Sequence, residues 1–189
     1  MAKSKSKIQI NFIGEASNDV TGSCVHIKTP HRQILLECGS FQSCGSTLEN
    51  YKINNKYFDF KPKEIDYVFL MHNHIDHIGL TPKLYKHGCT AKVVVPSGTK
   101  PIAEILLRDS AHIMDVDALE LSDKFKRDYY PIYTDRDVDK CLSNYTEYPI
   151  GEMIELDEYI KFKFIPSGHI LNSAQLELWI TDGNVTKKI

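Results

Sequence analysis

The chain has 189 residues, of which 42% are hydrophobic and 25% are charged, and its formal net charge is −2. These proportions are those of an ordinary globular protein with room for one hydrophobic core. No apolar run approaches the roughly 18 residues of a membrane-spanning helix, and no apolar signal segment follows the start. The composition therefore excludes a membrane span and predicts a cytoplasmic protein. It also excludes a positive field over the whole surface, so nucleic-acid binding would need a local patch.

The first seven residues mix lysines with small residues and predict a flexible basic tail over residues 1–7. Residues 8–189 contain no linker and no internal repeat, so we expect them to form one domain. The five cysteines are Cys24, Cys38, Cys44, Cys89 and Cys141. They form no CxxC pair, which favours reduced thiols, and none has a clear role as nucleophile or ligand.

Strand patterns come first along the chain. Apolar and polar residues alternate over 8–13 and 24–28, and a third strand pattern covers 33–37, so these three segments predict an antiparallel meander. Residues 40–66 have no clean period, and we expect a loop with a short helix there. The apolar run 67–71 predicts a buried strand.

Helices and strands alternate after residue 80. Thr81 is the expected cap of a short helix with Pro82 at its first position, and Gly88 ends that helix. A buried strand over 91–95 follows. The expected face of a helix from Lys100 to about Met114, capped by Thr99, comprises Ile102, Ile105, Leu106, Asp109 and Ile113.

A second helix begins at Thr134, with Asp137 as its capping-box partner. Strands over 152–156, 159–165 and 175–181 complete the pattern. The order strand, polar loop, helix, strand indicates the α/β class.

Residues 72–77, which we call the metal motif, carry three histidines and one aspartate directly after the buried strand 67–71. Neutral imidazole suits zinc, and an interleaved carboxylate lets neighbouring ligands serve two ions. His72 and His74 stand at alternate positions and can point to one side of an extended loop, while Asp76 and His77 can turn toward a second ion. Asp76 is also the candidate catalytic residue, because a carboxylate beside an activated water can orient it and accept its proton.

His169 is the further candidate ligand. It follows Gly168 at the end of the strand 159–165, where a side chain can complete a site built from loops. The other histidines, His26, His31, His87 and His112, are interpreted as structural.

These motifs resemble the metallo-β-lactamase superfamily, and in particular its beta-CASP branch of RNA-processing nucleases. The superfamily motif HxHxDH is present as His72-Asn73-His74-Ile75-Asp76-His77. The branch-specific resemblance lies in four segments and one further stretch: Thr21-Gly22-Ser23-Cys24, Leu35 to Gln42, Leu107-Arg108-Asp109-Ser110-Ala111-His112-Ile113, Gly168 to Gln175, and Pro131 to Val138. The resemblance runs from about residue 8 to residue 181.

The resemblance implies a fold, a cofactor and a reaction. The fold is an αββα sandwich of two mixed sheets, and the cofactor is a pair of zinc ions. His72, His74 and His169 would hold one ion, and Asp76 and His77 the other. The reaction would be hydrolysis of RNA phosphodiesters, internally, from the 5′ end, or both.

The chain departs from the family pattern in three ways. Glu37 stands where the family has Asp, a carboxylate that supports the site, and one extra methylene would shift it by about 1 Å. Asn172 replaces a glycine. The beta-CASP domain and a C-terminal part with a bridging aspartate and a further histidine do not follow, and Asp182 is interpreted as a turn residue. We therefore expect the N-terminal portion of such a nuclease, with an incomplete sandwich that a homodimer or a further segment would complete.

Two alternatives remain at this stage. The shared HxHxDH motif also suits a hydrolase of small esters, thioesters or lactams, which would turn over such substrates without cleaving RNA. The absent ligands also suit an inactive fragment that binds RNA or a partner chain weakly. Such a fragment would hold well under one ion per chain.

Overall fold

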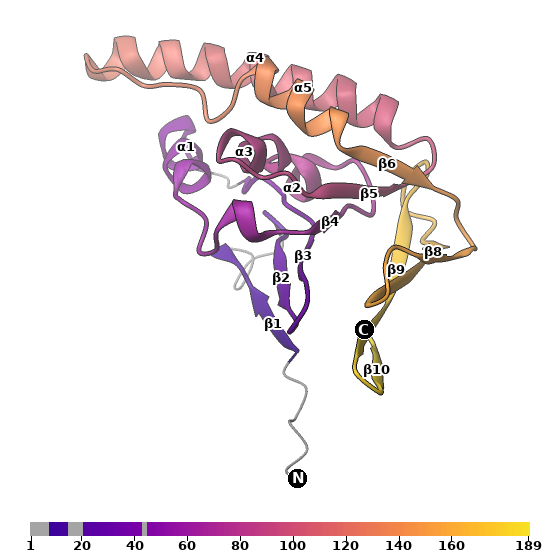
Figure 1. Ribbon diagram of the computed structural model, residues 1–189. Helices are drawn as coiled ribbons and strands as arrows, with labels where there is room; N and C mark the ends of the chain where they lie inside the picture. Colours follow the sequence, from indigo (N-terminus) through magenta and orange to yellow (C-terminus); the bar gives the residue numbers. More distant parts are fainter. Residues whose placement is uncertain (1–7, 15–20, 43–44) are drawn as a thin grey trace.

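The computed structural model describes residues 8–14, 21–42 and 45–189 (Figure 1). The predicted tail and Cys44 lie outside these residues. The strands are β1 (Gln9–Phe12), β2 (Val25–Lys28), β3 (Gln33–Leu36), β4 (Tyr67–Phe69), β5 (Lys92–Pro96), β6 (Tyr145–Tyr148), β7 (Met153–Glu155), β8 (Ile160–Pro166), β9 (Ala174–Asp182) and β10 (Val185–Lys188). The helices are α1 (Thr47–Asn55), η2 (Pro62–Glu64), α2 (Ile75–Ile78), α3 (Thr81–Lys86), α4 (Lys100–Phe125) and α5 (Asp135–Ser143).

The first sheet has the order β1-β2-β3-β4-β5-β6. Strands β1 to β3 pair antiparallel, which confirms the predicted meander, whereas β3 to β6 pair parallel. Helices connect the parallel strands, as parallel pairing requires. The middle strands β4 and β5 are buried on both faces, and Val68, Phe69 and Val93 to Val95 are each 0% exposed.

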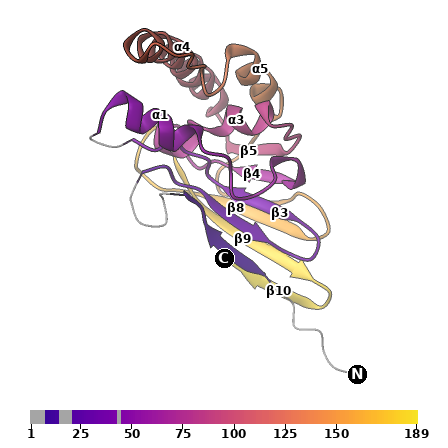
Figure 2. The ribbon, with the colours of Figure 1, turned by 90° about the vertical axis from the view of Figure 1, so that its left-hand side faces the viewer.

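The second sheet, β10-β9-β8-β7, is antiparallel and packs against the first. Two cores result. One joins the helices to the first sheet, and the other lies between the sheets, with Phe69 of β4 edge-on to Phe162 of β8 at a centroid distance of 5.2 Å. Figures 1 and 2 show the helices together on the far side of the first sheet. The predicted α/β class with two stacked sheets is confirmed.

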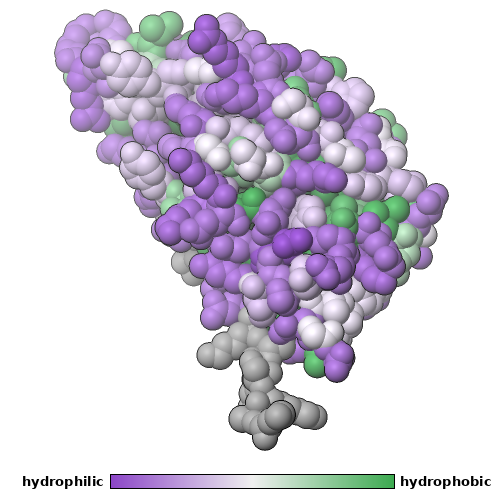
Figure 3. Space-filling model, in the orientation of Figure 1, coloured by the Kyte–Doolittle hydropathy of each residue, from purple (hydrophilic) through white to green (hydrophobic). Residues whose placement is uncertain are grey.

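One helical layer of the αββα sandwich is present in the described part of the chain. Residues packed into the inter-sheet core come from strands and their connections, not from helices. On the face shown in Figure 3, a hydrophobic strip crosses the right half where the two sheets meet. Among the described residues, no helix is both long enough and apolar enough to cross a membrane, α4 included.

Helix α4 differs from its prediction in length and in buried face. It continues to Phe125, and its buried residues are Ala103, Leu107, Ala111, Ala118 and Leu121. Ile105 and Ile113, predicted to face the core, are 70% and 50% exposed. That prediction was wrong because the helix carries two apolar stripes. The alanine-rich stripe lets the helix approach its neighbours more closely than an isoleucine stripe would.

Several local predictions can also be judged. The capping pair at the start of α5 is confirmed, since the Thr134 backbone N–H donates to the Asp137 carboxylate at 3.1 Å. The caps at Thr81 and Thr99 were wrong: Leu80 precedes α3, and the Thr99 side chain makes no capping bond. Strand β6 was missed because its four residues form a strand only through parallel pairing with β5.

Candidate metal centre

The metal motif follows β4 at the carboxyl end of the parallel strands, where α/β sheets place their ligand sites. It was expected to be a loop, but residues Ile75–Ile78 form one helical turn, α2. Three backbone hydrogen bonds clamp this turn from the neighbouring loops: Ser23 N to Asp76 O (2.9 Å), Cys38 N to His77 O (2.8 Å) and Ser40 N to Ile75 O (3.0 Å). The backbone of the motif is therefore fixed from outside as well as by its own helical bonds.

Gly39 makes the closest of these approaches. A Cβ atom at Gly39 would lie 1.6 Å from the carbonyl oxygen of Asp76 and 2.1 Å from its carbonyl carbon. Only a residue without a side chain fits there, which explains the glycine in the Glu37-Cys38-Gly39 stretch.

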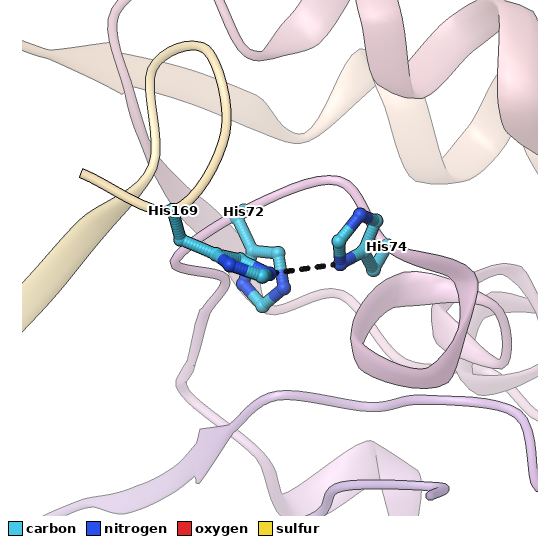
Figure 4. Close-up of side chains that lie close together, drawn as sticks. All are labelled: His72, His74 and His169. Atoms are coloured by element: carbon cyan, nitrogen blue, oxygen red, sulfur yellow. Dashed lines mark hydrogen bonds between the residues drawn. The ribbon is translucent and has the colours of Figure 1, made fainter. Parts of the chain in front are cut away.

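Three of the predicted ligands come together in space. Ligand nitrogens of His72, His74 and His169 all lie within 4.8 Å of one another. Nδ1 of His74 is 3.2 Å from Nε2 of His169, 95 positions away in the chain (Figure 4). The rings converge from two loops, one after β4 and one between β8 and β9.

The loop that carries His169 is held by Ser173, which is 5% exposed. The Ser173 hydroxyl oxygen accepts hydrogen bonds from the backbone N–H groups of His169 (3.1 Å) and Ile170 (3.0 Å). Ala174 N then donates to Met71 O at 2.9 Å and joins this loop to the segment before the metal motif. Asn172 adopts a φ of 59°, a conformation that asparagine tolerates better than most residues. Its substitution for glycine therefore leaves the loop intact.

His77 lies between two carboxylates. Its Nε2 is 3.6 Å from Oδ2 of Asp76, and its Nδ1 is 3.6 Å from Oε1 of Glu37. The Asp76 side chain is 26% exposed, whereas that of Glu37 is 6% exposed and accepts a hydrogen bond from Met71 N at 3.1 Å. The more open carboxylate is placed to hold an ion with His77, and the buried one is placed to orient the ring from behind.

Glu37, His72 and His77 also form a second group whose ligand atoms lie within 4.8 Å of one another. Asp76 belongs to neither three-residue group, although it lies beside His77. The Glu37 carboxylate is thus nearer the metal-binding atoms than its predicted supporting role required. His72 is shared by both groups.

The electrostatics of the centre favour neutral imidazoles. Burial lowers the pKa of His72 to about 4, and neighbouring His77, His74 and His169 lower it further. His72 is therefore uncharged at neutral pH, as a metal ligand must be. Burial raises the pKa of Glu37, although His77 opposes that shift. Burial lowers the pKa of His77, but Glu37 and Asp76 outweigh it, so that the net shift is upward.

Unpartnered buried atoms show that this donor set fits a metal. Nε2 of His72, Nδ1 of His77 and Oε2 of Glu37 are buried and have no hydrogen-bond partner among the described residues. Leaving such atoms unpaired is costly. Imidazole nitrogens and carboxylate oxygens at this spacing are the ligands that zinc takes.

Replacing Glu37 with Gln is expected to weaken zinc binding about 10- to 100-fold, the usual effect of losing an outer carboxylate partner. The amide keeps the size of the side chain and an oxygen for the N–H of Met71, but it removes the negative charge beside His77. A zinc titration against a competing chelator measures the effect. The matched control is Glu155→Gln, an exposed carboxylate of β7 paired with Lys161. Unchanged zinc affinity in Glu37→Gln would contradict the role of Glu37.

Other side chains lie elsewhere or were missed. Asp182 ends β9 and pairs with His31 at 3.3 Å, in agreement with its interpretation as a turn residue. Sequence reasoning missed Ser173 and Asn73, which hold the two ligand loops. The Asn73 amide donates to Thr99 O at 3.1 Å and ties the metal motif to the start of α4. Neither residue carries a ligand atom, so only the fold reveals them.

Known proteins place the chain in a family. The family described as the Metallo-beta-lactamase superfamily matches residues 18–152. Ribonuclease TTHA0252 of Thermus thermophilus is 31% identical over 159 residues, which are 84% of this chain and 32% of that protein. Transcription termination factor FttA of Methanocaldococcus jannaschii is 26% identical over 179 residues, which are 93% of this chain and 26% of that protein.

A third relative, Probable RNase MJ4 of the same archaeon, is 25% identical and covers 90% of this chain and 36% of its own length. The chain thus spans about a quarter to a third of the length of these curated relatives. All three are nucleases or termination factors of the beta-CASP type. With the match over residues 18–152, the chain belongs to the metallo-β-lactamase superfamily, whose members are metal-dependent hydrolases.

Proposed function

We propose that the chain is a zinc-dependent hydrolase of RNA phosphodiester bonds. The convergence of His72, His74 and His169, with the His77–Asp76 pair beside them, is the observation that carries this proposal. The family is one of metal-dependent hydrolases, and relatives named as ribonucleases make RNA the substrate class.

The residues divide into two ligand sets. His72, His74 and His169 hold the first zinc ion, and Asp76 and His77 hold the second, with Glu37 orienting the His77 ring. Zinc, when bound, lowers the pKa of a coordinated water to about 7 and polarises a phosphoryl oxygen. The Asp76 carboxylate orients the attacking water and accepts its proton. The clamp at Ser23, Cys38 and Ser40 keeps this geometry rigid.

The test is cleavage of RNA labelled at its 5′ or 3′ end by the zinc-loaded chain. We expect fragments that disappear on chelation, return with zinc and are absent in His74→Ala, because His74 supplies one of three ligands of the first ion. Lys187→Gln, an exposed change on β10, is the control and should cleave normally. The two labels distinguish internal cleavage from attack at the 5′ end.

Cleavage by His74→Ala at the wild-type rate would refute the site. Turnover of a thioester or a β-lactam without RNA cleavage would refute the substrate class and leave the metal centre standing.

A further inference from the structure

Residues 56–63, which we call the aromatic–lysine segment, differ from the rest of the surface. They read Lys-Tyr-Phe-Asp-Phe-Lys-Pro-Lys and connect α1 to η2. Together with Lys52 they carry four lysines and one aspartate, in a chain whose net charge is −2. This is the kind of local positive patch that nucleic-acid binding would require here.

The aromatic rings of the segment form a braced platform. Phe58 stacks on Phe60 at a centroid distance of 5.0 Å, and Phe60, 8% exposed, packs against the ring of His26 at 5.1 Å. Tyr57 approaches His87 at 5.8 Å, yet it is 86% exposed. A large aromatic side chain so open to water next to a buried aromatic cluster is typical of a binding surface.

Lys83 fixes the start of the segment from beneath. This buried lysine of α3 donates to the backbone carbonyls of Asn54 (2.6 Å) and Lys56. Its ammonium group also lies 4.7 Å from the centre of the Phe58 ring. The segment is therefore held rigidly before any ligand arrives, which reduces the entropy lost on binding.

Two hollows flank the platform, and Tyr57 and Phe58 line both of them. Their volumes are about 460 Å³ and 410 Å³, within the range of sites for small organic groups. The larger hollow is also bounded by Gly39 and Leu80, which adjoin the metal motif. The smaller hollow is bounded by Lys61 and Lys63. A chain lying across Tyr57 would thus meet lysines on one side and the back of the metal centre on the other.

We propose that the aromatic–lysine segment binds single-stranded RNA outside the metal centre, with a base stacked on Tyr57 and phosphates near Lys61 and Lys63. Aromatic faces between lysines are how single strands are held without sequence preference. Lys61 pairs with Glu64 at 2.9 Å, but its side chain is 80% exposed, and such surface pairs exchange readily for a phosphate. The inference rests on the proposed function only for its choice of RNA.

The test measures binding of a fluorescent 12-nucleotide oligouridine by anisotropy, with gels to show that the RNA stays intact. Tyr57→Ala is expected to weaken binding about fivefold or more, the usual cost of losing one base–aromatic stack, while Tyr57→Phe binds normally. Tyr130→Ala, also an exposed tyrosine (68%), should bind like the wild type. Circular dichroism shows whether each variant is folded.

A second arm tests the charges. Lys61→Gln with Lys63→Gln should flatten the dependence of log affinity on log salt by about two, one for each lost phosphate contact, whereas Lys187→Gln on β10 should not. Unchanged affinity in Tyr57→Ala would overturn the proposal. So would equally strong competition by an oligoglutamate of the same charge, which has no bases to stack. Loss of cleavage with normal RNA binding would instead refute the proposed function and leave this surface standing.

Discussion

Gly39→Ala is expected to lower the free energy of unfolding by about 3 kcal/mol or more, a large effect for one added methyl group. The methyl carbon would sit 1.6 Å from the carbonyl oxygen of Asp76, so the backbone of the 37–40 stretch or of α2 must move. Either movement breaks the hydrogen bonds from Cys38 to His77 and from Ser40 to Ile75. The same change should therefore weaken zinc binding.

Urea denaturation followed by the fluorescence of Trp179, the single tryptophan, measures this effect. Gly183→Ala is the matched control: its φ is +59° and no atom lies within 4 Å of the added carbon. It should cost only about 1 kcal/mol, the penalty of a left-handed backbone conformation. A Gly39→Ala protein as stable as Gly183→Ala would show that the motif is not clamped in this way.

His72→Ala is expected to remove both ions, not one. The His72 ring lies 4.0 Å from that of His77 and 4.9 Å from that of His74, and His72 belongs to both groups of candidate ligands. Loss of a direct ligand should cost more than the roughly 100-fold that loss of an outer partner can cost. His169→Ala, by contrast, alters only the first group and should leave about one zinc ion per chain.

Elemental analysis after exhaustive dialysis separates these outcomes, with urea denaturation to show that each variant is folded. Equal zinc content in His72→Ala and His169→Ala would contradict the shared position of His72. Wild-type zinc content in His72→Ala would contradict the centre as a whole.

The sequence predicted the ligand histidines because their spacing is local chemistry. The six residues of the metal motif carry the pattern by themselves, and His169 follows a strand end and a glycine, where loop ligands are found. Folding then placed His169 3.2 Å from His74, as a site built from two loops requires. The ligand roles remain predictions until a metal is measured.

What the sequence did not reveal depends on tertiary contacts. The face of α4 was misjudged because Ile105 and Ile113 look like core residues, whereas contact with neighbouring elements selects the alanine stripe. The proximity of the Glu37 carboxylate to His72 and His77 follows from a φ of 61° at Glu37 and from the bond to Met71, and neither has a sequence signal.

The zinc content of the purified 189-residue chain tests the central claim most directly. After loosely bound ions are removed, the proposed ligand sets predict about two zinc ions per chain. A value well below one ion per chain would contradict the proposed metal centre and, with it, zinc-dependent hydrolysis by this chain.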